Sequence, residues 1–285
     1  MTCRIVAEVS ANHLGSMARA LAIVAAAARA GAWGVKFQTY TPNQMVSRET
    51  EITEGPWKGR NALGLYCEAH TPREWHAELF ARARGLGLTP FSSVFHPDDV
   101  DFLEKLDCQF YKISSFELTD LDLIRHAART GKPLVMSTGM ATVDEISLAV
   151  LATRTPYERM THLTLLKCTS AYPASPADAN LATMVHMFKN WPVEVGLSDH
   201  TKGIGVAVAA AALGATMIEK HLTLRRDDGG PDAEFSMEPE EFRQLVTECR
   251  RASMAVGEVR YGPTESEAPS LRLRRQPGGM RGVIG

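Results

Sequence analysis

The sequence predicts an α/β protein of the (β/α)8 TIM barrel class. Three observations predict it: the length of 285 residues, short β-rich runs that alternate with helical patterns, and a total of eight such runs. The runs are residues 4–10, 34–40, 88–95, 110–115, 134–138, 163–169, 193–198 and 217–223. The alternative is a doubly wound open sheet, which usually has fewer repeats and a glycine-rich first turn. The turn "ANHLGS" after the first run holds one glycine and is a poor dinucleotide-binding fingerprint.

The segments between the runs carry helix signals. The segment "SMARALAIVAAAARAG" begins with Ser16, a plausible N-terminal cap, and ends at Gly31, while "GVAVAAAALG" ends at Gly214. After the last run, "EPEEFRQLVTECRRASMAVG" places apolar residues at helical spacing. These patterns predict repeated β-then-α units, which build a parallel sheet.

The chain is predicted to form one catalytic barrel with one long insertion and a C-terminal tail. The barrel is expected over residues 1–262. Residues 41–71, after the second run, are far longer than a usual βα loop and predict an insertion that acts as a lid or an interface. Residues 263–285 read as a linker-like, glycine-rich tail.

Composition excludes several functional classes. The formal net charge is −2 without a long single-sign block, so the sequence predicts no nucleic-acid partner. No stretch of about 18 apolar residues indicates a membrane span, and the first apolar run is interrupted by Glu8, unlike a signal sequence. A cytoplasmic protein is therefore expected. Its scattered cysteines read as reduced thiols rather than as disulfides or a zinc site, and they are Cys3, Cys67, Cys108, Cys168 and Cys249.

Two neighbouring strands are predicted to end in histidines, His200 and His221. Adjacent strands lie about 4.8 Å apart, so both imidazoles could bind one ion, although a single histidine beside a strand is more often a satisfied polar group. Two imidazoles completed by water or substrate oxygens suit Mn²⁺ or Mg²⁺ rather than a closed zinc site, with Co²⁺ also compatible. Asp199 and Asp232 could orient these ligands or bind sugar hydroxyls, although an aspartate in a Gly-Pro turn is often only turn chemistry.

A second group of polar strand ends predicts an anion site. It is expected to be a ring of cationic and neutral donors without acids of its own, made by Lys36, Lys112, Ser115, Ser137, Ser170 and Ser198. Alternatively, the serines satisfy backbone groups at the strand ends. Glu8 and Glu117 are then the carboxylates that remain for proton transfer.

Eight segments, in order through about residue 275, resemble one known family. They are "AEVSANHLGS", "GVKFQTYTP", "YKISSFELTD", "GKPLVMSTGMAT", "LLKCTSAYPASPADANL", "GLSDHTKG", "ALGATMIEKHLTL" and "GGPDAEFSMEPEEF". They look like the sialic acid synthase family, whose members condense phosphoenolpyruvate with an amino sugar to give a nine-carbon ulosonic acid. The resemblance implies a (β/α)8 barrel, the same condensation reaction, a bound divalent metal and a homodimer.

The resemblance also implies roles for single residues. It implies that His200 and His221 bind the metal and that Glu8 and Glu117 lie near the reacting carbons. It implies that the sugar is faced by Gln38, Tyr172 and Asp232. The phosphoenolpyruvate pocket is implied to consist of Lys36, Ser93, Lys112, Ser115, Ser137, Ser170 and Ser198. One departure is Val94, where the family commonly has proline. Family members usually continue into a small antifreeze-like domain that caps the partner's sugar site, and the tail at 263–285 is expected not to form that domain.

Within the family, three segments are more similar to the pseudaminic acid synthases. They are "GPWKGRNALGLYCEAHTPREWH", "FSSVF" and "SSFELTD". The resemblance thus implies a 2,4-diacetamido-2,4,6-trideoxy hexose as acceptor, with N-acetylneuraminate or legionaminic acid synthesis as the alternatives. Two rival classes also remain, a metal-dependent hydrolase and a non-catalytic barrel relative. A hydrolase would not need two lysines around an anion, and a non-catalytic relative should have lost some of these polar strand ends.

Overall fold

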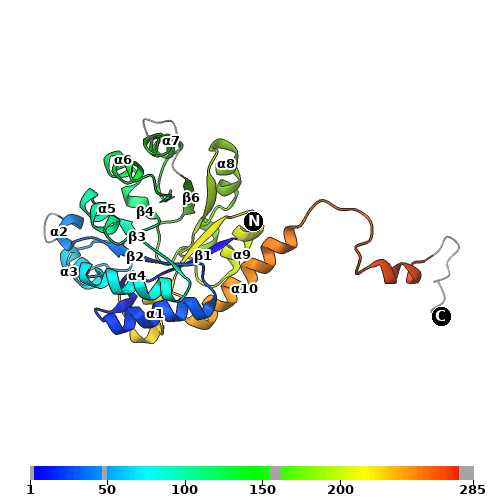
Figure 1. Ribbon diagram of the computed structural model, residues 1–285, viewed down its shortest axis with the longest axis horizontal. Coiled ribbons are helices and arrows are strands. Elements are labelled where there is room, and N and C mark those ends of the chain that lie inside the picture. The colour runs from blue at the N-terminus through cyan, green and yellow to red at the C-terminus, as the bar shows by residue number, and fades with distance from the viewer. Residues whose placement is uncertain (1–2, 47–49, 155–161, 276–285) are drawn as a thin grey trace. The chain divides into compact units, whose positions relative to one another are not determined.

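The computed structural model describes residues 3–46, 50–154 and 162–275. Eight parallel strands form a closed barrel in the order β1 to β8, with β8 paired back to β1 (Figure 1). Helices surround the strands, so the predicted (β/α)8 TIM barrel is confirmed. The open-sheet alternative is wrong because the β1–β8 seam is hydrogen-bonded from Arg4 to Glu8.

The strands are short and lie within or close to the predicted runs. They are β1 (Arg4–Glu8), β2 (Gly34–Thr39), β3 (Thr89–Val94), β4 (Tyr111–Ile113), β5 (Leu134–Ser137), β6 (Leu163–Cys168), β7 (Glu194–Ser198) and β8 (Met217–His221). The fourth strand stops before the predicted residue 115, because Ser115 begins a short 3-10 helix, Ser115–Glu117. The residues after β4, from Ser114 to Glu117, line the pocket of the barrel.

The helices that follow the strands cover the outside of the barrel. They are α1 (Met17–Ala30), α2 (Pro42–Met45), α3 (Ala62–Ala69), α4 (His76–Gly85), α5 (Pro97–Glu104), α6 (Leu121–Arg129), α7 (Val143–Ala152), α8 (Ala182–Asn190), α9 (Gly205–Ala212) and α10 (Pro239–Val256). The signals predicted for α1 are present: the Ser16 side chain accepts from the Arg19 backbone, and Gly31 ends the helix with φ of 83°. The buried face of α1 packs on the apolar core between helices and sheet.

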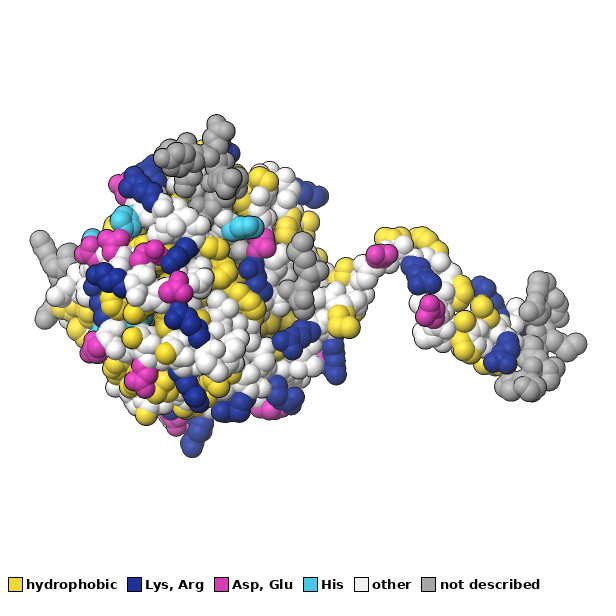
Figure 2. Space-filling model, in the orientation of Figure 1, with side chains coloured by type: hydrophobic (Ala, Val, Ile, Leu, Met, Phe, Trp, Pro, Cys, Tyr) yellow, Lys and Arg dark blue, Asp and Glu magenta, His cyan; other side chains and the backbone are white. Residues whose placement is uncertain are grey.

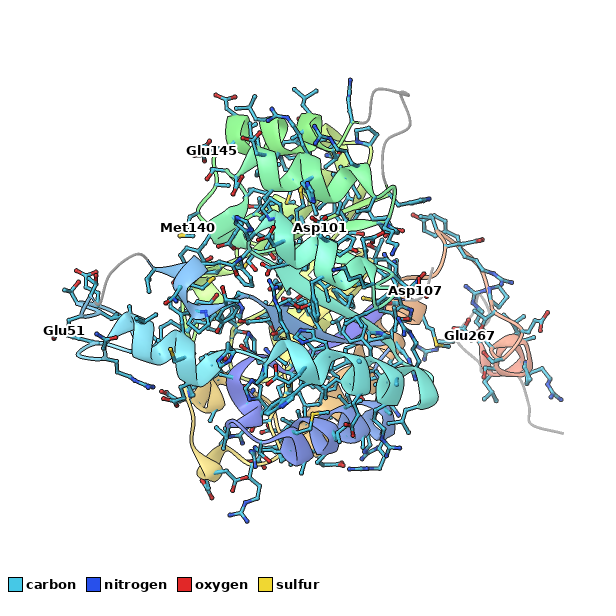
Figure 3. All side chains as sticks on the ribbon, turned by 60° about the vertical axis from the view of Figure 1, so that its left-hand side comes forward. Glu51, Asp101, Asp107, Met140, Glu145 and Glu267 are labelled. Carbon is cyan, nitrogen blue, oxygen red and sulfur yellow. The ribbon has the colours of Figure 1, made fainter. Side chains whose placement is uncertain are left out.

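The predicted insertion at 41–71 contains two short helices, α2 and α3. Between them, Glu51 forms an isolated antiparallel bridge with Asn61, and Figure 3 shows Glu51 at the outer end of this excursion. Residues 47–49 lie outside the described part. The insertion is therefore folded at its two ends rather than being a plain loop.

The chain divides into two units, Met1–Ala255 and Val256–Gly285. The first contains the whole barrel, and the second contains a short 3-10 helix at Ala268–Leu273. The domain limits predicted at residue 262 stay a prediction. Basic and acidic side chains are interspersed over the visible face of the barrel unit (Figure 2). No helix within the described residues is long and apolar enough to span a membrane.

Candidate active site

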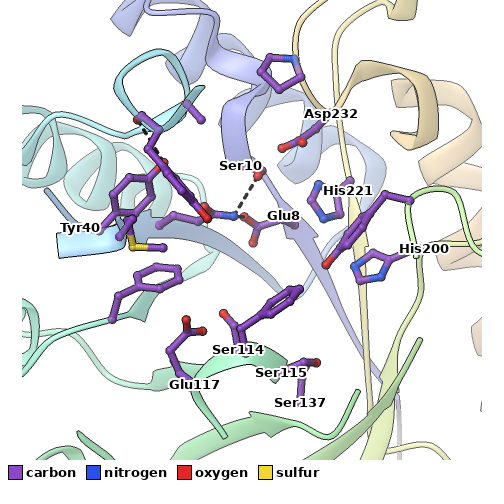
Figure 4. Close-up of a pocket in the computed structure, with 18 of the residues that line it drawn as sticks. Glu8, Ser10, Tyr40, Ser114, Ser115, Glu117, Ser137, His200, His221 and Asp232 are labelled. Carbon is purple, nitrogen blue, oxygen red and sulfur yellow. Dashed lines mark hydrogen bonds between the residues drawn. The ribbon is translucent and has the colours of Figure 1, made fainter. Parts of the chain in front are cut away.

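One pocket of about 690 Å³ lies at the carboxyl ends of the strands. This is the end at which (β/α)8 barrels carry their chemistry. The strand register explains which side chains meet there: Glu8 is the Cα partner of both Lys36 on β2 and His221 on β8. Glu8, His200, His221 and Asp232 point into the same space in Figure 4, with Ser115 and Glu117 nearby. Its lining from the predicted sites comprises Glu8, Lys36, Gln38, Lys112, Ser115, Glu117, Ser137, Tyr172, Ser198, His200, His221 and Asp232.

Two lysines and two carboxylates form the buried floor of this pocket. The Lys36 ammonium lies 2.6 Å from a Glu8 oxygen and 3.7 Å from Glu219, and it donates to the Ser93 hydroxyl at 2.8 Å. Lys112 lies 4.0 Å from the same Glu219 oxygen. The prediction of a cation ring without acids of its own is therefore wrong. The physical reason is barrel closure, which pairs β8 with β1, so that Glu219 joins Glu8 beside Lys36.

Burial and the neighbouring opposite charges shift the pKa values of the floor residues in opposite directions. Burial by itself lowers the pKa of Lys36, but the nearby Glu219 and Glu8 carboxylates outweigh it and raise that pKa. Burial also lowers the pKa of Lys112, and here the opposing effect of the Glu219 carboxylate is smaller than the effect of burial, so the pKa stays lowered. Burial also raises the pKa of Glu8 against the opposing pull of Lys36. An anion entering the floor therefore meets two ammonium groups already held in place by carboxylates.

The hydroxyls of Ser115 and Ser170 lie close to Gly139, which follows β5. The Gly139 backbone N–H donates to the Ser115 hydroxyl at 3.1 Å. A Cβ atom at Gly139 would lie 2.3 Å from the Ser170 hydroxyl and 2.7 Å from the Ser115 hydroxyl. The hydroxyls of Ser137 and Ser170 are buried without a hydrogen-bond partner among the described residues. Buried hydroxyls that lack a partner can donate to an anionic oxygen, and Gly139 leaves the space beside Ser170 and Ser115 open because it has no side chain.

The two histidines face each other across the β7–β8 edge. Their ring centroids are 5.5 Å apart. The Nδ1 atom of His200 lies 2.9 Å from the Thr169 carbonyl. The Nδ1 atom of His221 is buried and has no hydrogen-bond partner within the part of the chain that the structure describes. A histidine that donates one ring N–H to a carbonyl has its other nitrogen free to bind a metal. In the described ranges no three His, Cys, Asp or Glu side chains converge as a metal site, and the two imidazoles are the groups predicted to bind an ion.

The three residues predicted to face the sugar line the rim beside the histidines. Tyr172 packs against His200 at 4.3 Å between ring centroids. Gln38 donates to the Ser10 hydroxyl at 2.9 Å and to Glu8 at 3.3 Å. Asp232 accepts from the Ala11 backbone at 3.2 Å, and burial raises its pKa. The pocket thus brings these three side chains together with the histidine pair.

Glu117 lies at the opposite side of the floor from the histidine pair in Figure 4. One of its carboxyl oxygens is buried without a hydrogen-bond partner among the described residues. Burial raises its pKa to about 7, against the lowering effect of Lys112. Glu117 can therefore gain or lose a proton near neutral pH, which is what a general acid or base requires.

Sequence reasoning assigned no role to Glu219, which lines the pocket, and it allowed Asp199 to bind sugar hydroxyls. Glu219 lies two residues before His221 on β8, and this period-two spacing on one strand could have placed both side chains in the pocket. Lys220, between them, points away and lies 2.7 Å from Asp199. Asp199 is therefore not available to bind sugar. Cys168 also lines the pocket: burial raises its pKa, but the neighbouring His200 outweighs this and lowers it to about 7.

Comparison with known proteins gives this arrangement a context. The NeuB family model matches residues 23–261. The chain is 45% identical over 261 residues to the pseudaminic acid synthase of Helicobacter pylori, covering 90% of this chain and 76% of that protein. It is 36% identical to the N,N'-diacetyllegionaminic acid synthase of Legionella pneumophila, over 97% of this chain and 79% of that protein.

Solved structures agree with the sequence relatives. The N-acetylneuraminic acid synthetase from Leptospira borgpetersenii superposes with a TM-score of 0.84 at 30% identity, covering 95% of this chain and 90% of that one. The DAHP synthase of Thermotoga maritima, with a TM-score of 0.69 at 14% identity, shares the fold, covering 90% of this chain and 70% of that one. The match of the family model to most of the chain, together with these relatives, shows that the protein belongs to the NeuB family.

Proposed function

We propose that this protein is a phosphoenolpyruvate-dependent condensing synthase that makes pseudaminic acid. It would join phosphoenolpyruvate to the aldehyde of a 2,4-diacetamido-2,4,6-trideoxy hexose and release phosphate. The observation that carries the proposal is the pocket floor, in which Lys36 and Lys112 lie beside the His200–His221 pair. The identity to two named pseudaminic acid synthases, 45% and 42%, supports the choice of product.

The lysines and serines would hold phosphoenolpyruvate. Its carboxylate and phosphate need several donors, and the ammonium groups of Lys36 and Lys112 share the buried floor with the serine hydroxyls. The unpartnered hydroxyls of Ser137 and Ser170 are free to donate to a phosphate oxygen. Ser93 supports Lys36 through its 2.8 Å hydrogen bond, and Ser198 donates to Glu219 at 3.2 Å. These two serines would thus orient the charged groups that surround the anion.

His200 and His221 would hold a divalent ion, Mn²⁺ or Mg²⁺ with Co²⁺ as a substitute. The unpartnered Nδ1 of His221 and the carbonyl-anchored ring of His200 fit this role. When bound, such an ion supplies Lewis-acid polarisation of a carbonyl oxygen. Tyr172 packs on His200 and limits the directions from which the sugar can approach that ring.

The bond changes balance without any other co-reactant. Carbon three of phosphoenolpyruvate bonds to the sugar aldehyde carbon, whose oxygen gains a proton and becomes a hydroxyl. One water adds to carbon two and loses a proton, and the bond from carbon two to the phosphate oxygen then breaks with phosphate as the leaving group. Glu8 is the proposed base for that water, because it lies 2.6 Å from Lys36 at the centre of the floor. Glu117, on the other side of the floor, is the second group that can transfer a proton.

Phosphate release in a two-substrate assay tests the reaction. We expect release that requires phosphoenolpyruvate, the diacetamido sugar and a divalent ion together. A hydrolase would release phosphate, or another product, without the sugar, and a non-catalytic relative would release none. Glu8→Gln keeps the shape of the side chain, so phosphoenolpyruvate should still bind while turnover falls about 10²-fold or more. Unchanged turnover of this variant would contradict the role of Glu8.

Assembly and location belong to the same proposal. We infer a homodimer that acts in the cytoplasm, from the resemblance of the chain to its family. Light scattering after gel filtration measures the assembly, and a monomer would contradict it. Fractionation of the source cells measures the location, and recovery in the membrane or the medium would contradict it.

A further inference from the structure

Helix α3 (Ala62–Ala69) turns one apolar stripe toward the active-site pocket. Ala62, Leu65, Tyr66 and Ala69 all line the pocket, at the spacing that puts four residues on one face of a helix. An apolar helical stripe normally packs on the protein's own core. Here Ala62 and Leu65 are buried at 8% and 7% exposure, yet they border the cavity that would receive substrate.

The stripe is held in place by polar contacts at both ends of α3. Asn61 caps its first turn by accepting from the Gly64 backbone at 2.8 Å. At the other end, the Ala69 carbonyl lies 3.2 Å from the ring nitrogen Nε2 of His13, which follows β1. The Tyr40 hydroxyl donates to the Tyr66 carbonyl at 3.4 Å. These bonds tie the helix to the chain after β1 and β2, so the stripe is a wall with a defined position.

Trp57 extends this wall toward the rim that carries the sugar-facing residues. Its indole N–H donates to the Pro231 carbonyl at 2.9 Å, next to Asp232. Its ring lies 5.6 Å from the Tyr172 ring, between centroids. The insertion therefore reaches the far side of the mouth, and an acceptor bound beside Tyr172 and Asp232 would also meet Trp57.

The wall and the floor differ sharply in chemistry. The floor holds the lysines and glutamates, whereas the insertion contributes Met45, Val46, Ile52, Trp57, Ala62, Leu65, Tyr66 and Ala69, with Glu54 as the one charged lining residue from its described part. A sugar hydroxyl buried against such a surface loses its hydrogen bonds to water without replacement. A methyl group in the same place gains free energy by leaving water.

We infer that the α3 stripe and Trp57 form an apolar subsite that selects the acceptor. The substrate class is an amino sugar that lacks a hydroxyl at its terminal carbon and carries acetamido methyls on the face turned to α3. This inference rests on the proposed function and deepens it. It makes Leu65, at the centre of the stripe, a specificity-determining residue.

Leu65→Gln tests the inference, with Leu63→Gln as the matched control. Leu63 lies on the same helix, is half-buried and does not line the pocket. The measurement is the ratio of kcat/KM for the diacetamido trideoxy sugar to kcat/KM for N-acetylmannosamine. We expect Leu65→Gln to lower this ratio about 10-fold or more, with the KM for phosphoenolpyruvate unchanged, and Leu63→Gln to keep the wild-type ratio. An unchanged ratio in folded Leu65→Gln overturns the inference.

A binding measurement separates this inference from the proposed reaction. Saturation-transfer NMR compares binding of the two sugars to the same variants without phosphoenolpyruvate. The subsite is supported if the wild type prefers to bind the trideoxy sugar and Leu65→Gln loses this preference. If the wild type also releases no phosphate in the assay, that absence of release overturns the proposed reaction but not the subsite. If Leu65→Gln does not fold, Ala62→Ser adds one hydroxyl to the same stripe and should lower the preference. A preference that this folded variant keeps contradicts the subsite.

Discussion

Lys220→Met should destabilise the barrel strongly, because Lys220 is half of a buried ion pair. Its ammonium lies 2.7 Å from an Asp199 oxygen and donates to the Thr201 carbonyl at 2.6 Å. Both side chains are 1% exposed. The other Asp199 oxygen accepts from the Thr201 backbone at 2.9 Å and from its hydroxyl at 2.8 Å. The pair therefore joins the end of β8 to the turn that carries His200.

The magnitude follows from this burial. Methionine fills similar space but leaves the Asp199 carboxylate buried without its cation. Removal of one partner of a buried pair costs about 3–5 kcal/mol. For a domain of roughly 150–250 residues, each kcal/mol lowers the melting temperature by about 2–4 °C, so we expect a fall of roughly 6–20 °C.

Thermal unfolding followed by circular dichroism measures this effect. Lys202→Met is the matched control, because the Lys202–Glu234 pair is 61% and 69% exposed and surface pairs contribute about 0–1 kcal/mol. The double variant Asp199→Asn with Lys220→Met removes the unpaired charge while asparagine still accepts from Thr201, so it should recover part of the loss. If Lys220→Met melts within about 2 °C of the wild type, the argument from buried charge is wrong.

Three further predictions concern the site. His221→Ala should lose Mn²⁺ binding in calorimetry and phosphate release in the assay, because one of two imidazole ligands is gone. Retention of both would refute the metal proposal. Gly139→Ala should weaken phosphoenolpyruvate binding at least about 10-fold, since its Cβ would lie 2.3 Å from the Ser170 hydroxyl, whereas Gly205→Ala meets nothing within 4 Å and should bind normally. Burial raises the Glu117 pKa from 4.5 to about 7, so the folded state holds more protons than the unfolded state in that range and stability is lost as pH rises through it. Glu117→Gln should therefore melt above the wild type at pH 8 and not at pH 4, and an equal difference at both pH values would count against a buried carboxyl.

Local patterns in the sequence were enough to predict the barrel and most of its polar mouth. Eight β-rich runs alternate with helical segments, and parallel strands have all their carboxyl ends at one edge. His200, His221, Lys36 and Lys112 were therefore expected in one place without knowledge of any contact, and the structure brings them into one pocket. The family resemblance added the substrates, which spacing by itself does not specify.

Tertiary structure decided which neighbours face each other. Closure of the β1–β8 seam places His221 opposite Glu8 and brings Glu219 to within 3.7 Å of Lys36, so the cation ring contains a carboxylate to which the sequence assigned no role. Alternation along β8 sends Lys220 outward to Asp199 while its two neighbours face the pocket. The insertion, whose role as a lid or an interface stays a prediction, contains a helix whose apolar stripe borders the cavity. Register, closure and the docking of an insertion depend on contacts between residues far apart in the chain, and a local pattern carries no information about those contacts.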